Sequence, residues 1–484
     1  MYSPQYLGPN EDFLEAQARV CTGPHQTRPL GKKESDGPHP DQIFEIILDS
    51  LNGKLDSKHA VSEAQMGAFF TAMTIRKYFP ESTQWSTAEK DAFNKYYSIL
   101  NTHLPKDIKF LIDPTLEYIS QNPTEHIVVT ALQKILQGQH LGYTETRQMC
   151  EAIMTNEVKP ALKAGALIGQ RMNRETYEEV RGYLDSYYAP KNVQPIDVDN
   201  LTHFGQPYDG ATRYFRPTLF IAAVRAALGQ PSILHSVDMM PPKNGITEEA
   251  ILQSLGAKTD LTLEQVSKVI TNENVGFGYV SQREYSPGAY NIRELRVHIK
   301  KRPPWAATEK ALQFFTAQKN NYMVIGYYHI GYEKPLLQMA LERGCQGAVA
   351  IKGEEGTSSY SLRLGKPSTP ERMAVNYSQG FLCVNGKREE FSLDIDPKMY
   401  GFDYQINPRP DVISAEAYAE EGVAALSGKK GQIYDRIVLN TAIVDYLLGI
   451  YADPYVAIEQ VREVIENGSA LDHLKAYISV SNEI

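Results

Sequence analysis

Residues 321–352, NYMVIGYYHIGYEKPLLQMALERGCQGAVAIK, decide the fold class of this chain. The segment opens with a strand-like run, Asn321–Tyr328, and closes with a second one, Gly347–Lys352. Between them, Pro335–Arg343 has the apolar spacing of a short helix. A helix that joins two buried strands is the usual crossover of a parallel sheet. We therefore predict a mainly parallel sheet that is covered by helices.

The same alternation extends to both sides of this segment. Upstream, strand-like runs at 232–236 and 275–281 surround a helix at 247–255, and we expect a further helix at 308–317. Downstream, residues 378–396 form two β runs around Asn385-Gly386, a dipeptide typical of a tight hairpin. From about residue 415 the apolar spacing is helical again. These patterns predict one large α/β domain over residues 191–484, which ends in helices.

The first 190 residues carry a different pattern. Residues 1–40 are rich in Pro, Gly and polar residues without periodicity, which predicts an irregular N-terminal arm. Helical spacing follows, and capping boxes at Ser62–Gln65 and Thr176–Glu179 mark two helix starts. We expect an additional helical segment at 41–125 and a small helical domain at 126–190 that packs with the C-terminal helices. The fold class is therefore α/β, with a small N-terminal helical domain before the large one.

Composition narrows the function classes. The chain has 484 residues and a net charge of −9, whereas a non-specific nucleic-acid binder usually carries a basic excess. No run of apolar residues is long enough to span a bilayer, and the first 40 residues do not resemble an export signal. The four cysteines form no CxxC pair. These features predict a cytoplasmic protein with no membrane partner and no cysteine-rich metal site.

Two segments of the chain resemble one enzyme family. Residues 131–184, which include QGQHLGYTETRQMCEAIM, resemble the N-terminal helical domain of anthranilate phosphoribosyltransferases, and residues 424–478, which include GQIYDRIVLNTAIVDYLLG, resemble their final helices. The resemblance covers roughly residues 125–480. It implies the glycosyltransferase family 3 fold, shared with class II nucleoside phosphorylases. In that fold a helical domain used for dimer contacts is hinged to a large α/β domain, and phosphoribosyl pyrophosphate binds in the cleft.

The family's pyrophosphate loop is altered in this chain. The family has a GTGGD motif, in which glycine lets backbone amides close on the ligand. The matching segment is FGQPYDGATR at 204–213, without the paired glycines. The family's Asn-Ser-Thr becomes Arg216-Pro217-Thr218, and of its Lys-His-Gly-Asn loop only His235 remains.

The family's magnesium-binding acidic pair is also missing. It would follow Gly353-Glu354-Glu355-Gly356, where the chain has Thr357, Ser358 and Ser359. Two hydroxyls are poor replacements for carboxylates as Mg²⁺ ligands. Glu354 and Glu355 would substitute only if the loop were shifted. We expect no resident metal, and Mg²⁺ only if transferase activity survives.

One element of the aromatic-acid site keeps its spacing. The family has two arginines six residues apart beside the acceptor, and Arg296 and Arg302 keep that interval. Arginine pairs bidentately with carboxylates and phosphates, which suits this role. A solvated basic helix end explains the same pattern, so both interpretations stay open.

These departures resemble a divergent branch of the family, whose members lack both motifs and have been linked with nucleic-acid binding. Our first hypothesis is a binding protein that takes a phosphorylated or nucleotide-like ligand in the interdomain cleft and retains little or no anthranilate phosphoribosyltransferase activity. Alternatives are an active pentosyltransferase that uses phosphoribosyl pyrophosphate, and a single-stranded nucleic-acid-binding or regulatory scaffold protein. By resemblance we also expect a homodimer formed through the helical domain. The candidate ligand-binding residues are Asp209, Gly210, Thr212, Arg213, Thr218, His235, Lys243, Arg296 and Arg302.

Several basic and aromatic residues are candidates for a wider binding surface. Arg216, Lys300, Lys301 and Lys352 would extend the basic lining of the cleft. Tyr208, Tyr214 or Trp305 would provide stacking surfaces for bases.

Overall fold

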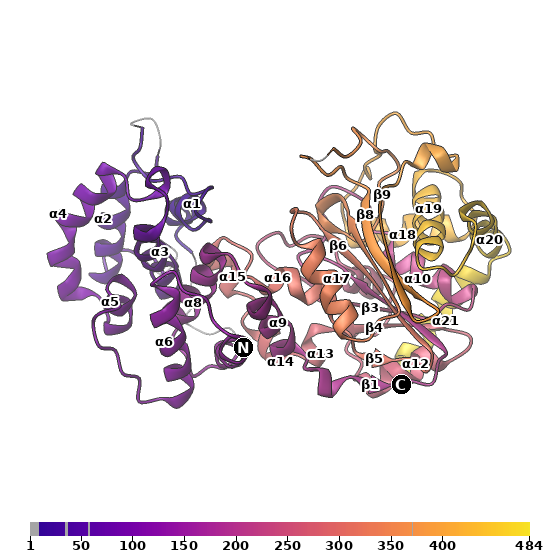
Figure 1. Cartoon of the computed structure of the whole chain (residues 1–484), viewed down its shortest axis with the longest axis horizontal. Coiled ribbons are helices and arrows are strands. Elements are labelled where there is room, and N and C mark those ends of the chain that lie inside the picture. Colours follow the sequence, from indigo (N-terminus) through magenta and orange to yellow (C-terminus); the bar gives the residue numbers. More distant parts are fainter. Residues whose placement is uncertain (1–8, 34–36, 57–58, 370) are drawn as a thin grey trace. The chain divides into compact units, whose positions relative to one another are not determined.

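A computed structural model describes residues 9–33, 37–56, 59–369 and 371–484. The chain divides into two compact units (Figure 1). The first contains residues 1–186 and 288–305, and the second contains residues 187–287 and 306–484. Each unit has its own buried core. Among the described residues, none of the helices combines the length and the apolar character that crossing a bilayer requires.

The first unit is helical. Its main helices are α1 (Glu11–Val20), α2 (Pro40–Leu51), α3 (Glu63–Ile75), α4 (Thr87–His103), α5 (Lys106–Ile112), α6 (Pro123–Ile135), α7 (Tyr143–Ile153), α8 (Pro160–Asn173) and α9 (Tyr177–Tyr187). The later segment adds α14 (Pro287–Asn291), α15 (Leu295–Ile299) and the start of α16 (Trp305–Thr308). Short 3₁₀ turns follow α3 at η2 (Arg76–Tyr78) and η3 (Glu81–Thr83).

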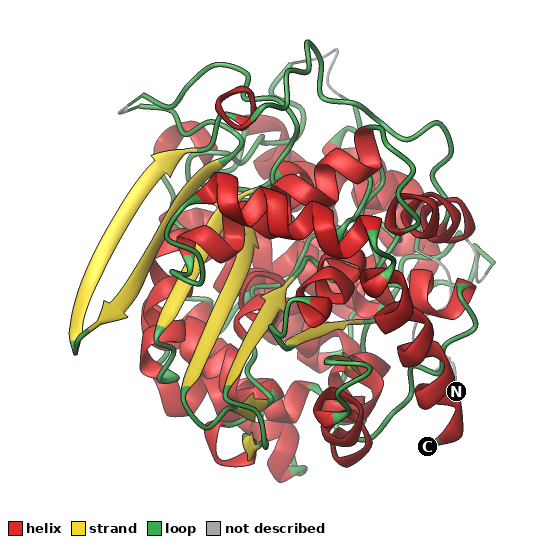
Figure 2. Cartoon of the chain, turned by 90° about the vertical axis from the view of Figure 1, so that its right-hand side faces the viewer, coloured by secondary structure: helices red, strands yellow, loops and turns green. Residues whose placement is uncertain are grey.

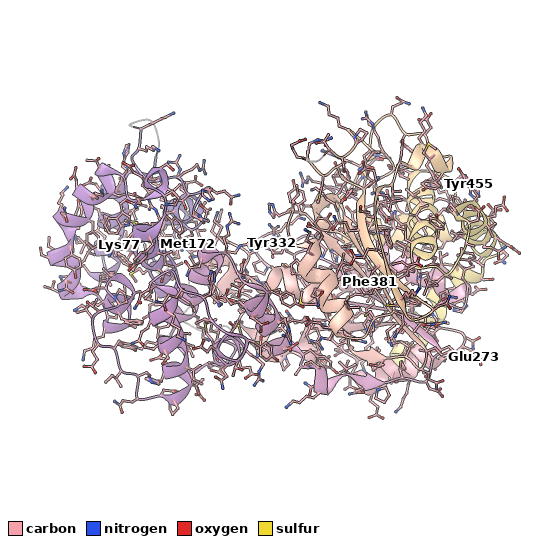
Figure 3. The ribbon with its side chains drawn as sticks, in the orientation of Figure 1. Lys77, Met172, Glu273, Tyr332, Phe381 and Tyr455 are labelled. Carbon is pink, nitrogen blue, oxygen red and sulfur yellow. The ribbon has the colours of Figure 1, made fainter. Side chains whose placement is uncertain are left out.

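Helices α3 and α8 form the centre of this unit. A Cβ on Gly67 of α3 would lie 2.2 Å from the carbonyl oxygen of Ala161 in α8, so the two backbones touch at a residue without a side chain. Met172 of α8 is fully buried (Figure 3). Beside them, Arg76 forms a bidentate ion pair with Glu89, with both nitrogen–oxygen distances 2.7 Å. The segment at 41–125 therefore supplies core residues of its own.

The local signals for helix starts are confirmed. The Ser62 side chain accepts the amide proton of Gln65, and Thr176 and Glu179 cap each other in the same way. The arm expected at 1–40 is not irregular throughout, because α1 lies inside it; residues 1–8 and 34–36 are outside the described residues. Asn10 caps α1, and Phe13 packs its ring 5.1 Å from that of Phe69. Tertiary packing thus orders a segment whose composition resembles a loop.

The second unit contains a seven-stranded sheet in the order β4-β3-β2-β6-β7-β8-β9 (Figure 2). Its strands are β2 (Asn200–Gly205), β3 (Ser232–Ser236), β4 (Phe277–Ser281), β6 (Asn320–Tyr327), β7 (Gly347–Lys352), β8 (Tyr377–Val384) and β9 (Lys387–Asp394). The first five run parallel, and β8 and β9 form an antiparallel hairpin at one edge. A mainly parallel sheet is therefore confirmed, and with it the α/β fold class.

Helices cover this sheet. They are α10 (Thr218–Ala227), α11 (Glu248–Ser254), α12 (Leu263–Thr271), α13 (Gln282–Tyr285), α17 (Glu333–Glu342), α18 (Ala415–Leu426), α19 (Gln432–Leu447), α20 (Pro454–Glu466) and α21 (Ser469–Glu483). The 3₁₀ turns are η4 (Pro190–Asn192), η5 (Glu309–Ala311), η6 (Glu354–Gly356) and η7 (Pro397–Tyr400). The buried α10 packs against α19 and α21, and its Arg225 pairs with Asp445 of α19. The C-terminal helices thus belong to the second unit's core.

Most of the predicted elements in this unit are found, but one is wrong. The strand expected at 232–236 and the hairpin around Asn385-Gly386 are both present, and both turn residues have positive φ, 52° and 75°. The helix expected at 308–317 is not. There the chain forms η5 and then β5 (Phe315–Thr316), which pairs with β1 (Gln194–Pro195). Pairing with a strand about 120 residues earlier overrides the local helical spacing.

Candidate anion-binding site

The order of the strands marks one edge of the sheet as the place for a site. From β2 the chain passes through α10 to β3 on one side, and from β6 it passes through α17 to β7 on the other. In open α/β sheets, ligands bind outside the carboxyl ends of two such neighbouring strands. The loop after β7 lies there, since a Cβ on Gly326 of β6 would be 2.2 Å from the carbonyl oxygen of Gly356.

Glu355 of this loop is held by the turn that follows β2. Its carboxylate accepts hydrogen bonds from the backbone amides of Thr212 (3.0 Å), Arg213 (3.1 Å) and Tyr214 (3.2 Å). The Thr212 hydroxyl donates a fourth, at 3.1 Å. Successive amides that converge on one point form an anion-binding nest. We call the amides of 212–214, the Thr212 hydroxyl and the Lys243 ammonium the anion cradle.

Lys243 supplies positive charge to the anion cradle. Its ammonium lies 2.5 Å from Glu355 Oε1 and also donates to the Gly210 carbonyl at 2.7 Å. Burial opposes the ionisation of Glu355, but the hydrogen bond and charge of Lys243, with the amides, outweigh it and lower the pKa of that carboxyl. Arg213 Nε is 3.8 Å away on a side chain that is 55% exposed. The Glu355 carboxylate, whose side chain is 1% exposed, is therefore held in its charged form.

The wall of the anion cradle consists of two loops, around Ala211 and Ile246, that are joined by backbone hydrogen bonds. Ala211 and Ile246 exchange backbone hydrogen bonds of 2.9 and 2.8 Å. Gly210 has a φ of +74°, and a Cβ there would lie 2.3 Å from the backbone of Gly245, so glycine is required. Behind them, Arg216 bonds to Glu248 at 2.6 Å and donates to the carbonyls of two loop residues, Pro207 and Ile246. Arg216 is 0% exposed, so it supports the loops and does not line a cleft as expected.

The positions expected for the acidic pair hold buried hydroxyls that already have partners. Ser358 donates its amide proton to the side-chain oxygen of Gln206 at 3.1 Å, and its hydroxyl also contacts that side chain. The Gln206 amide group donates to Thr218 Oγ1 at 2.7 Å. Thr357 and Ser359 lie with their hydroxyl oxygens 3.0 Å apart. These contacts join the loop after β7 to β2 and leave no carboxylate at these positions.

The neighbouring carboxylate, Glu354, is held on a different set of partners. Its side chain contacts the Asn407 amide and lies 3.7 Å from Arg436. Burial raises the pKa of Glu354 despite that arginine. In the described part of the chain, no group of three or more His, Cys, Asp or Glu side chains is arranged to hold a metal ion.

His235 lies at the end of β3, beneath the loop. Its Nδ1 is 2.6 Å from the Tyr208 hydroxyl, which in turn is 2.8 Å from the Tyr285 hydroxyl. Complete burial lowers the pKa of His235 to about 3, with His203 and Arg216 adding to the effect, so the imidazole is neutral. Tyr208 is 0% exposed. It therefore offers no ring face to a ligand, contrary to expectation.

The candidate ligand-binding residues divide into three groups. Asp209, Gly210, Thr212, Arg213 and Lys243 come together at or beside the anion cradle.

Thr218 and His235 are buried behind the loop, 1% exposed each. Arg296 and Arg302 belong to the first unit, where Arg296 is 3% exposed and Arg302 is exposed. Trp305, a suggested stacking residue, is 2% exposed in the same unit.

Sequence reasoning missed the central residue of the site. The sequence suggests Glu355 only as a substitute magnesium ligand, whereas in the structure it is the acceptor of the cradle. Its partners lie about 140 residues earlier in the chain, at sequence separations of 141 to 143. The one local signal is the pair of glycines, Gly353 and Gly356, that flanks it in an otherwise acidic turn.

Comparison with known proteins agrees with this architecture. Residues 129–189 match the helical bundle domain of a glycosyl transferase family. Anthranilate phosphoribosyltransferases of Polynucleobacter asymbioticus and Nitrosomonas europaea are 24% and 23% identical, each over 360 residues. These alignments cover 72% and 73% of this chain and 97% and 98% of the relatives.

Solved structures show the same fold. The anthranilate phosphoribosyltransferase of Thermus thermophilus aligns with a TM-score of 0.55 at 19% identity, over 73% of this chain and 99% of that one. The enzyme of Saccharomyces cerevisiae, in complex with PRPP and Mg, aligns with a TM-score of 0.58 at 16% identity, over 74% of this chain and 98% of that one. The chain therefore has the anthranilate phosphoribosyltransferase-like fold of glycosyltransferase family 3 and is a homologue of these enzymes.

Proposed function

We propose that the second unit binds a phosphate-bearing small molecule at the anion cradle and does not transfer phosphoribose to anthranilate. The observation that carries this proposal is the group of donors around Glu355: three backbone amides, one hydroxyl and one ammonium. A phosphate group has the negative charge and the acceptor oxygens that the same donors need. The Glu355 carboxylate already occupies these donors, which supports a negatively charged ligand at the cradle.

The donor set does not suit the magnesium step of the related enzymes. Ser358 and Ser359 are buried and 1% and 3% exposed, and their hydroxyls have protein partners. Glu355 contacts Lys243, and Glu354 lies beside Arg436. Hard divalent cations need several oxygen ligands without competing ammonium or guanidinium groups. We therefore propose binding without Mg²⁺ and no catalysis.

The purified chain is expected to form no phosphoribosyl anthranilate. The assay follows the loss of anthranilate fluorescence in the presence of phosphoribosyl pyrophosphate and MgCl₂, against a protein-free blank. In parallel, calorimetry with pyrophosphate should detect binding that is equally strong with EDTA. Turnover above the blank, or binding that requires Mg²⁺, would contradict the proposal.

Lys243→Met is expected to weaken pyrophosphate binding by roughly tenfold or more. A hydrogen bond to a charged group contributes about 1.5–3 kcal/mol, and Lys243 supplies the cradle's partly buried cation. Lys268→Met is the matched control, because its exposed ammonium pairs with Glu264 within α12 and not with Glu355. Equal losses in both variants would indicate general electrostatic attraction and not a site at the cradle.

A nucleotide is a second candidate ligand, because its phosphates would bind at the anion cradle and its base could stack on a nearby aromatic ring. The loop after β6 exposes the Tyr328 ring, which is 50% exposed and has the Lys352 ammonium 5.0 Å from its centroid. A Cβ on Gly356 would lie 3.5 Å from Tyr328 Cβ, so this ring is next to the loop that carries Glu355. Exposed aromatic rings beside basic groups stack on bases. If the wild type binds ATP more tightly than pyrophosphate, and Tyr328→Ala removes that difference in affinity, a nucleotide ligand is supported.

The remaining expectations stay predictions. Arg296 and Arg302 would contact an aromatic acceptor, and the helical unit would form a homodimer. Single-stranded nucleic acid is tested by a shift assay at two salt concentrations, because phosphate contacts weaken steeply with salt.

A further inference from the structure

We propose that Glu355 is a built-in occupant of the anion cradle, which an incoming phosphate must displace before it binds. This inference rests on the proposed function, since it assumes that the cradle takes a phosphate. In addition, Glu355 competes with the ligand for the cradle, so the protein without ligand inhibits its own binding site. The ligand's affinity is then set by how readily the Glu355 side chain leaves.

The contacts of Glu355 match those of a bound anion. Both carboxylate oxygens are used: Oε1 by Thr212 and Lys243, and Oε2 by the amides of Arg213 and Tyr214. The side chain is 1% exposed, so it fills the cradle. A phosphate cannot use the same amides while the carboxylate is there. Occupancy by one excludes the other.

The backbone at Glu355 is held in an unfavourable conformation. Its φ of 56° and ψ of 12° lie in the left-handed region, which is unfavourable for a residue with a side chain and easily adopted only by glycine. Such conformations persist where surrounding contacts maintain them. Here the contacts of the Glu355 carboxylate with the anion cradle contribute to that hold. Release of the side chain removes them, so the backbone at this one residue is freer to relax.

The rest of the loop is anchored independently of Glu355. The Lys310 ammonium donates to the carbonyls of Gly326 (2.9 Å) and Gly356 (3.1 Å). Ser358 is bonded to Gln206, and Glu354 to Asn407. The fold of the loop on both sides of Glu355 thus has its own support. One side chain can leave while the loop keeps its place.

The trigger for release is a ligand and not acid. The Lys243 ammonium, the partly exposed Arg213 and the amides of 212–214 favour the charged form of Glu355. The neighbouring Glu354 carboxylate opposes it, and the Tyr418 hydroxyl also interacts with Glu355. Its pKa is lower than usual, so it stays charged throughout the neutral range. A pyrophosphate or phosphate dianion carries more charge than one carboxylate and competes for the same donors. The inhibited state therefore responds to ligand concentration.

The test compares pyrophosphate binding by the full-length wild type and Glu355→Ala. The variant should bind with a dissociation constant lower by roughly tenfold or more. In the wild type only the molecules whose cradle is free of Glu355 can bind, whereas in the variant every molecule can. Glu389→Ala is the matched control: it removes one negative charge from the exposed face of β9 and should leave the dissociation constant unchanged. Glu355→Gln provides the same comparison if the alanine variant does not fold.

Thermal unfolding gives a second readout. The melting temperature of Glu355→Ala should fall below that of the wild type and recover on addition of sodium acetate or pyrophosphate at matched ionic strength. Acetate replaces the missing carboxylate, so it should stabilise the variant more than the wild type.

The outcomes separate the two proposals. If neither wild type nor variant binds pyrophosphate, the proposed function fails. If the wild type binds and Glu355→Ala binds equally or more weakly without acetate rescue, the cradle binds anions but Glu355 is a structural staple, and this inference is overturned. Tighter binding by the variant, with acetate rescue, supports both.

Discussion

Two buried histidines are expected to lower the free energy of unfolding by about 3 kcal/mol when the pH falls from 6.5 to 5. His203 of β2 and His235 of β3 are 0% and 1% exposed. Burial lowers the pKa of each to about 3, against 6.5 for the free side chain. Both are therefore neutral in the folded protein, and both take up a proton when it unfolds below pH 6.5.

The direction of this pH effect follows from the number of protons that the folded and the unfolded states bind. Above pH 6.5 both states hold neutral imidazoles, so the contribution to stability is complete there. As the pH falls toward 3, the unfolded state binds protons that the folded state does not, and stability falls by about 1.4 kcal/mol per histidine per pH unit. The raised pKa values of Glu249 and Glu354 act in the opposite direction, since the folded protein takes up protons at those carboxyls more readily. Glu63 and Glu421, whose pKa values burial also raises, act in the same direction as these two carboxyls, so variants of the histidines are needed to isolate the histidine contribution.

The measurement is urea unfolding of the full chain at several pH values. His203→Gln keeps an acceptor for the Phe314 amide, which lies 3.3 Å from His203 Nε2, but no longer titrates. The double variant with His235→Gln should have a flatter dependence of stability on pH, by an amount that approaches about 2.7 kcal/mol per unit below pH 5.5. His329→Gln, on an exposed loop, should leave the slope unchanged. An unaltered slope in the double variant would mean that these imidazoles are accessible to protons when folded.

How far the sequence predicts this molecule depends on the range of the interactions. The short apolar run at 232–236 and the Asn385-Gly386 turn are local signals, and the structure has β3 and the hairpin at those residues. Residues 308–317 have helical spacing, but a strand pair with Gln194–Pro195 decides their conformation. Pairing with a strand so distant in the sequence cannot be recognised from the local pattern of residues. Element types in repeated α/β segments are therefore predictable, and short isolated strands are not.

Whether a residue of the candidate site could be predicted also depends on the sequence distance to its partners. Thr212 and Arg213 were candidates because the resemblance aligned their loop with the family's pyrophosphate loop, and Lys243 was a candidate as a basic residue for the lining of the cleft. Glu355 was missed as the acceptor because its donors lie far away in the chain. Arg216 was expected to face a ligand, and only the fold shows that Glu248 covers its guanidinium. Residue type identifies a basic candidate, whereas burial and partners decide whether it meets solvent.

Arg216→Met is expected to destabilise the protein by about 3–5 kcal/mol. The arginine is completely buried, and its loss leaves the Glu248 carboxylate, also 0% exposed, without its cation. It also removes the donor to the carbonyls of Pro207 (3.1 Å) and Ile246 (3.3 Å). An uncompensated buried charge costs far more than a lost surface pair, because the protein interior does not screen it.

The second substitution separates charge burial from loop support. Arg216→Met with Glu248→Leu removes both charges, and stability measured by urea unfolding should recover most of the loss. Lys268→Met, which breaks an exposed pair on α12, is the control and should change little. A full loss in the double variant would show that the hydrogen bonds to the two carbonyls, and not the ion pair, hold this region.

Pyrophosphate binding by the stable double variant then tests the role of Arg216 in the site. The carbonyls of Pro207 and Ile246 belong to the two loops that position Gly210 and the anion cradle, and Arg216 is the side chain that bonds to both. Without that bridge the amides of 212–214 should converge less well, so affinity should fall by roughly tenfold even though stability is restored. Wild-type affinity in the double variant would show that the Ala211–Ile246 backbone bonds alone position the cradle. That result would confine Arg216 to stabilising the fold.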